Sequence, residues 1–226
     1  MICGHCNQET GNENQGHYWA LCKVTRTDRG HHFCCPGRCE LEEMAALKDV
    51  DTISGLLAAG VGHCLTLWPE WLFAITELDK RVENRDYAPP LWLQGKRIAL
   101  HAGQHIGGRK GKVSMEEGID SVTGMAVEAG WEPSAFSTDH FSCDLKKDEK
   151  TVRFGPDLIV RGAIACIVTL ARITRPRNKQ RIHGNPVVGD PWYTGAFGWR
   201  FENIVKLTRP ITCSGNRKVW SLKELA

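Results

Sequence analysis

The sequence predicts an α+β protein built on a small β-barrel with flanking helices, preceded by a small cysteine-rich segment. The later part of the chain alternates short β patterns with turns, and only a few stretches look helical. Several strands with few helices are typical of a sheet that curls on itself. Six of the ten cysteines lie in the first 39 residues. With 226 residues, the chain can hold one medium domain and one small one.

Composition and charge indicate a globular protein without deciding its partner. The apolar share is 42% and the charged share 24%, which argues against disorder. The net charge of +3 is too small to indicate nucleic-acid binding by itself. However, the stretches 87–114 and 158–189 contain lysine and arginine and no acid, so part of the surface is expected to be basic. Such runs are more often solvated faces, and they serve only as support.

The first residues are polar where a secretory signal would be apolar, so no signal peptide is expected. No stretch reaches the roughly 18 apolar residues of a membrane span. We therefore expect a cytoplasmic protein without a membrane partner. In that reducing compartment, clustered cysteines favour a metal site over disulfides.

Residues 1–40 have the cysteine spacing of a zinc ribbon. Cys3 and Cys6 form a CxxC knuckle, and a predicted hairpin leads to a second turn with Cys35 and Cys39. So short a segment has too little apolar material to fold alone, so we expect a structural Zn²⁺ on these four cysteines. The competing interpretations are a disulfide framework and free thiols. Four other side chains are alternative ligands: Cys22, Cys34, His31 and His32.

Residues 41–60 are rich in helix formers and are predicted to be a helical connector to a larger domain at 61–226. Strands of that domain are expected at 96–102, 162–173, 196–203 and 218–222, and helices at 68–78 and 114–129. Ser114 is the expected N-cap of the second helix, because Glu116 and Glu117 would lie favourably in its first turn.

Motifs follow one another in a fixed order along the larger domain. An apolar segment at 65–75 precedes Lys80-Arg-Val-Glu-Asn-Arg85, which precedes Gly95-Lys-Arg-Ile-Ala-Leu-His-Ala102. This order resembles the ASCH family, in which an apolar helix leads to Lys-x-x-Glu-x-Arg, then to a glycine and a strand ending in His-Ala. Later pieces continue the likeness, with a strand start at Gly162, a Gly-Trp pair at 198–199 and a closing strand through Trp220.

The resemblance implies a PUA-like β-barrel, a fold that generally serves as a nucleic-acid or nucleotide-binding cleft. The chain departs from the family where Leu78 replaces a glycine and where Pro69-Glu70-Trp71 replaces Pro-Trp. The stretch at about 103–155 looks like an insertion.

Lys80, Glu83 and Arg85 are the candidate chemical residues. In an extended segment Glu83 and Arg85 share a face, and Lys80 needs a turn to join them. Together they can form a structural ion-paired bracket, hold a ligand, or act as a hydrolytic Lys–Glu pair. Members of the ASCH family that resemble small nucleoside amidohydrolases remove an acyl group from modified cytidine with Lys, Thr and Glu. Lys80 matches that lysine, but Glu83 stands at the threonine position, which argues against a simple transfer of the activity.

The binding interpretation uses other side chains. Trp68, Trp71, Trp92 and Trp199 are candidates for stacking on a base, at about 1 to 3 kcal/mol each. Asn84 and His101 are candidates for the base edge. Four basic residues are candidates for the base edge or phosphates: Lys96, Arg97, Arg109 and Lys110. Tryptophans also fill cores, which is the favoured interpretation for Trp71, Trp199 and Trp220.

The sequence thus predicts a nucleic-acid-binding module, with RNA favoured over DNA, that recognises a modified or unpaired base. The alternative is a hydrolase, either an amidohydrolase or a nuclease, that acts on a modified nucleoside or nucleic acid through Lys80 and Glu83. A third interpretation is an adaptor that binds a protein partner through the zinc ribbon.

Overall fold

The computed structural model describes residues 38–107, 114–134, 142–174, 190–194 and 197–226. The chain divides into two compact units, Met1–Asp49 and Val50–Ala226. The first unit contains helix α1 (Arg38–Lys48). The zinc-ribbon prediction falls on Cys3, Cys6 and Cys35, which lie outside the described residues, as do its alternative ligands and the side chain of Cys39.

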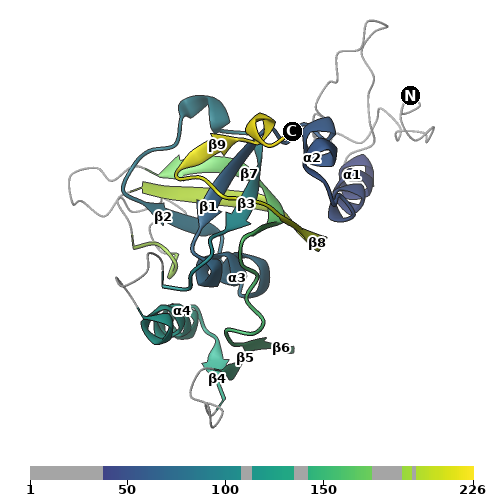
Figure 1. Ribbon diagram of the computed structural model, residues 1–226. Coiled ribbons are helices and arrows are strands. Elements are labelled where there is room, and N and C mark those ends of the chain that lie inside the picture. The colour runs from purple at the N-terminus through teal and green to yellow at the C-terminus, as the bar shows by residue number, and fades with distance from the viewer. Residues whose placement is uncertain (1–37, 108–113, 135–141, 175–189, 195–196) are drawn as a thin grey trace, which may run out of the picture. The chain divides into compact units, whose positions relative to one another are not determined.

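The second unit is an α+β domain whose main element is a curled six-stranded sheet, roughly half a barrel (Figure 1). Its strands are β1 (His63–Leu67), β2 (Val82–Arg85), β3 (Arg97–Ala102), β7 (Ala163–Thr174), β8 (Phe197–Thr212) and β9 (Val219–Ser221). They are hydrogen-bonded in the order β2-β8-β7-β3-β1-β9. β1 and β3 are parallel, and the other pairs are antiparallel. Register shifts between β7 and β8 mark irregularities of the kind that increase local twist and help a sheet to curl.

The described part of the region 103–155 adds a helix and a second sheet to this unit. It contains helix α4 (Met115–Glu128) and a three-stranded sheet of β4 (Glu132–Pro133), β5 (Cys143–Lys147) and β6 (Lys150–Phe154). The predicted cap of α4 is confirmed: Ser114 Oγ accepts the Glu117 N–H, and the Glu117 carboxylate accepts the Ser114 N–H. The remaining helical elements are α2 (Ile53–Ala58), α3 (Pro69–Glu77), η1 (Leu91–Leu93) and η2 (Leu222–Glu224).

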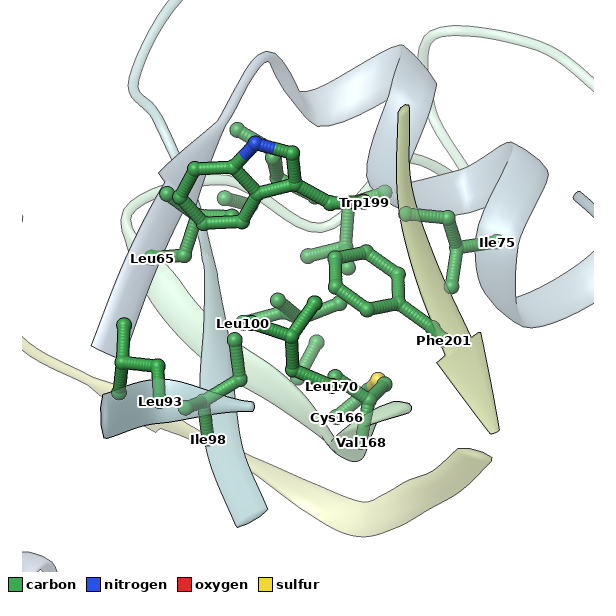
Figure 2. Packing of buried hydrophobic residues seen from close by; sticks show 14 residues of the cluster. Leu65, Ile75, Leu93, Ile98, Leu100, Cys166, Val168, Leu170, Trp199 and Phe201 are labelled. Atoms are coloured by element: carbon green, nitrogen blue, oxygen red, sulfur yellow. The ribbon is translucent and has the colours of Figure 1, made fainter. Parts of the chain in front are cut away.

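The main hydrophobic core fills the concave side of the curled sheet. Alternate residues of its strands point into this core, among them Leu65, Leu100 and Phe201, and Ile75 of α3 packs against them (Figure 2). The opposite side of α3, through Ala74 and Leu78, packs into a second core with α4 and the three-stranded sheet. Because α3 is buried on both sides, its first residues are held firmly in place.

Among the described residues, no helix has both the length and the apolar character needed to cross a membrane.

Candidate functional site: a cavity beside a buried Lys–Glu–Arg cluster

The turn after α3 brings Lys80 to Glu83. Leu78 ends the helix, and Asp79 adopts a left-handed conformation with φ 59°. This region is uncommon for residues other than glycine, although the short polar side chain of aspartate tolerates it. The Lys80 N–H then bonds back to the Ala74 carbonyl at 3.1 Å. The chain therefore turns directly before Lys80, and the Lys80 side chain reaches that of Glu83.

Lys80, Glu83 and Arg85 form one charged cluster, in which Lys80 and Glu83 are buried and Arg85 is partly buried. Lys80 is 1% exposed, and its Nζ lies 3.1 Å from Glu83 Oε2 and also donates to the Val82 carbonyl. Arg85 Nε lies 3.1 Å from Glu83 Oε1, an ion pair that lacks hydrogen-bond alignment. The Glu83 carboxylate thus stands between two cations.

Burial lowers the pKa of Lys80, because the ammonium has lost water, and the neighbouring Glu83 carboxylate opposes that shift. The Lys80 Nζ also lies 5.6 Å from the centre of the Trp71 ring. The indole face and the carboxylate therefore take the place of part of the missing water.

The cluster forms part of the wall of a cavity of about 370 Å³, a volume within the range of small-ligand sites. It lies where edge strand β2 approaches the end of β1. In the described part of the sheet, β9 pairs with β1 only along His63–Leu65, and beyond that point Arg85 Nη2 donates to the Thr66 carbonyl at 2.8 Å. Nine residues line the cavity: Trp68, Trp71, Lys80, Glu83, Asn84, Arg85, Asp86, Met125 and Thr194.

Asn84 is occupied by the protein itself. Its Nδ2 donates to the Trp192 carbonyl at 2.8 Å, and its Oδ1 accepts the Thr194 N–H at 2.9 Å. The side chain therefore fixes the segment that contributes Thr194 to the cavity wall. In this structure it positions the wall, and its amide is not free to read the edge of a base as the sequence suggested.

The structure brings some of the predicted binding residues to the cavity and places others elsewhere. Trp68 lines the cavity and is 46% exposed. Trp92 lies by the opposite end of β1, where its ring packs edge-on against His63 with centroids 4.6 Å apart. Trp199 is fully buried in the main core, and its Nε1 donates to the Tyr87 carbonyl, so it has no face for a ligand (Figure 2).

The predicted polar contacts are also dispersed. His101 is 1% exposed and lies beneath the segment after β8, with Nε2 3.2 Å from the Cys213 carbonyl. Lys96 and Arg97 stand at the start of β3, about 16 Å along the strand from its cavity end at roughly 3.3 Å per residue. Arg109 and Lys110 lie outside the described residues.

The sequence did not point to several residues at or near the cavity. Met125 and Thr194 are far along the chain from the Lys-x-x-Glu-x-Arg motif and carry no signal of their own. Trp71 was a stacking candidate for which core packing was the favoured interpretation; it follows Trp68 by one turn of α3 and lines the cavity. Glu70, in the same turn, is fully buried; its Oε1 accepts the Gly107 N–H at 3.0 Å, while its Oε2 has no partner among the described groups. Burial raises the pKa of Glu70.

Comparison with protein-family models and with curated proteins finds no match for this chain. The resemblance to the ASCH family therefore rests on the motifs alone. Among the described residues, no group of three or more histidine, cysteine or acidic side chains is placed to hold a metal ion.

Proposed function

We propose that the chain is a nucleic-acid-binding module of the ASCH, PUA-like type, and that it holds one unpaired or modified base, with RNA favoured over DNA, in the cavity beside Lys80 and Glu83. The observation that carries this proposal is the cavity itself. It combines a volume of about 370 Å³, two tryptophans and a preformed polar cluster. An apolar stacking surface with a few fixed polar groups is the usual composition of a small-ligand site.

The aromatic part of the site is suited to a flat ring. Trp68 is the N-cap residue of α3 and Trp71 lies one turn further, so the buried helix fixes the backbone positions of both residues. Every base has a π face, so stacking tolerates different sequences and contributes roughly 1 to 3 kcal/mol per base.

The charges of the cavity favour a neutral ligand. Lys80 and Arg85 are balanced by Glu83 and Asp86, so the lining carries no net charge. A phosphate placed inside would lose water without gaining an excess of positive charge. An uncharged base ring loses less hydration free energy than a phosphate on entering the cavity. Asp86 and Thr194, which are both exposed, offer polar groups for its edge.

The test is fluorescence polarisation of labelled single- and double-stranded RNA and DNA with wild type, Trp68→Ala and Trp92→Ala. The two tryptophans are similarly exposed, but only Trp68 lines the cavity. We expect Trp68→Ala to weaken binding to the preferred single strand about 5- to 150-fold, the equivalent of one lost stack, and Trp92→Ala to leave it unchanged. Equal losses in both variants, or no binding by wild type, would contradict the proposal.

One observation favours a second candidate, hydrolysis. A buried lysine with a lowered pKa, held against a carboxylate at a cavity, is the kind of perturbed pair that enzymes use as acid and base. In this structure both Glu83 oxygens are engaged, Oε2 by Lys80 and Oε1 by Arg85. A ligand would have to displace one cation before Glu83 could accept a proton from water, which is why binding is the first proposal.

Hydrolysis is tested by following acyl release from N-acylated nucleosides, and cleavage of RNA, by chromatography. If the chain is such an enzyme, Glu83→Gln should lower turnover at least 100-fold while the protein still melts cooperatively, and Trp92→Ala should keep full turnover. No product with wild-type protein in excess over substrate would exclude these two reactions and leave the binding proposal standing.

A further inference from the structure

The C-terminal part of the chain carries an acid-free run of exposed positive charge. From Ile204 to Lys223 there is no aspartate or glutamate. The run contains five exposed basic residues: Lys206, Arg209, Arg217, Lys218 and Lys223. Lys206 is paired with Glu77 at 2.5 Å, whereas the other four form no ion pair with the described residues. An exposed basic run of this kind suits an anionic polymer.

Two of these cations lie on a loop with a fixed path, the β8–β9 loop, Cys213–Lys218. At its start the Cys213 N–H bonds to the Gly162 carbonyl at 3.2 Å. Gly215 rests directly on the buried His101 ring, so close that a larger residue would collide with it. Lys218 ends the loop in a left-handed conformation with φ 59°. The Cys213 and Gly215 contacts, and the pairing of β9 from Val219 onward, fix the path of the loop that carries Arg217 and Lys218.

The β8–β9 loop lies next to the strand segment that forms the cavity wall. The Lys218 Nζ stands 5.6 Å from the centre of the Tyr87 ring. Tyr87 directly follows Arg85 and Asp86, which both line the cavity. In contrast, Lys96 and Arg97, the cations that the sequence suggested for phosphates, stand at the opposite end of β3.

These placements complement the neutral cavity. A base held there leaves its own phosphates outside, because the lining offers no excess of positive charge. We propose that the β8–β9 loop binds these flanking phosphates through Arg217 and Lys218, so that a single-stranded nucleic acid runs from the cavity across the loop. The inference rests on the proposed function and adds to it the surface that takes the backbone.

The test uses the salt dependence of binding, because each phosphate contact contributes about 0.7 to the slope of log K against log salt for single strands. The variants are Arg217→Gln, Arg217→Gln/Lys218→Gln, and the charge-matched control Lys96→Gln/Lys146→Gln, whose residues are both exposed and lie elsewhere. We expect the slope to fall by about 0.7 in the single variant and about 1.4 in the double variant. The control should change it by less than half as much as the double variant.

Trp68→Ala, measured in the same series, separates the two proposals. Loss of a stack lowers affinity at every salt concentration and leaves the slope unchanged, whereas loss of phosphate contacts lowers the slope.

If Trp68→Ala weakens binding while the loop variants and the control have the same slope, the loop proposal is wrong and the cavity proposal stands. If the loop variants lower the slope but Trp68→Ala has no effect, the backbone surface stands and the base cavity does not. Absence of wild-type binding to RNA and DNA overturns both.

Discussion

The two ends of strand β1 carry similar tryptophans in different surroundings. Trp68 follows the strand and is 46% exposed, and Trp92 packs by its beginning and is 55% exposed. At the Trp68 end there is a cavity with a buried lysine, a buried glutamate and a partly buried arginine in its wall. At the Trp92 end the neighbours are the ring of His63 and the exposed Leu91.

The difference shows that an exposed aromatic side chain is a poor guide to a site unless its surroundings are also known. Burying charges costs several kcal/mol per ion, and hydrophobic residues of similar size often stabilise a protein better. In this fold, the free-energy cost of burying charges falls on side chains that line a cavity, where a ligand can interact with them. Among the described residues, the Trp92 end has no comparable cluster of buried charges.

Replacing Lys80 should have the largest effect. Lys80→Met leaves the Glu83 carboxylate buried with only Arg85 as partner, so we expect a loss of about 3 to 5 kcal/mol in the free energy of unfolding. The matched change at the other end, Lys96→Met, removes an exposed lysine and should cost at most about 0.5 kcal/mol. Urea unfolding of both variants measures the contrast. Equal losses of unfolding free energy in the two variants would show that the cluster contributes no more to stability than an exposed lysine does.

Replacing Arg85 should have the next largest effect, because this side chain joins the edge strand β2 to the end of β1. Arg85→Met removes the bond to the Thr66 carbonyl and one partner of Glu83, and we expect a loss of about 1.5 to 3 kcal/mol. Hydrogen exchange should show the loss first in the amides of β2. Arg200→Met is the control, since its ion pairs are long, at 4.0 and 3.9 Å, and its side chain is 28% exposed. Unchanged β2 exchange in Arg85→Met would show that strand pairing alone holds this edge.

The contrast between the ends of β1 also separates what the sequence could predict from what it could not. Local patterns located α3, α4 and most of the main strands, because capping and alternation act over a few residues. β8, expected at 196–203, continues to Thr212 because pairing with β7 sustains it. β1 was missed: its five residues merge into the apolar run that continues into α3.

The candidate site was predictable only where it is local. The Lys80–Glu83–Arg85 cluster could be inferred, since it needs one turn and one strand. The expectation that Trp92 and Trp199 share a cleft with Trp68 assumed contacts between distant segments, which depend on strand order and register. The structure places Trp199 inside the core and Trp92 at the other end of β1. Met125 lines the cavity because α4 packs on α3, and no sequence motif predicts that packing.

Histidines at the two ends should make the protein less stable in mild acid. Burial lowers the pKa of His63 and of His101 below the usual 6.5. The unfolded chain then binds a proton more readily, so stability is complete above pH 6.5 and falls as the pH drops below that value, by at most about 1.4 kcal/mol per pH unit for each histidine. The thiols beside His101, Cys64 and Cys213, have raised pKa values and stay neutral throughout this range.

Denaturant unfolding from pH 7.5 to 5.5 checks the direction, with NMR titration of the two imidazoles. His101→Gln should flatten the profile more than His63→Gln, because His101 is almost completely buried and His63 is partly open to water. A folded His101 that titrates at 6.5 or above would contradict the assignment.

The smallest effect concerns Glu70, and its sign is opposite to that of the other substitutions. This carboxyl is fully buried at the cavity end, one of its oxygens has no described partner, and burial raises its pKa. Glu70→Gln keeps an acceptor for the Gly107 N–H and removes the charge, so at pH 7 the variant should be more stable by about 1 kcal/mol. A raised carboxyl pKa penalises folding only where the group must ionise, so the gain in stability should shrink as the pH falls towards 4.

Denaturant unfolding at pH 7 and pH 4 measures this gain, with the substitution of an exposed glutamate on β8, Glu202→Gln, as the neutral control. If Glu70→Gln is less stable than wild type at pH 7, the Glu70 carboxylate stabilises the fold. The free-energy cost of burying charge at the cavity end would then come from Lys80, Glu83 and Arg85 alone.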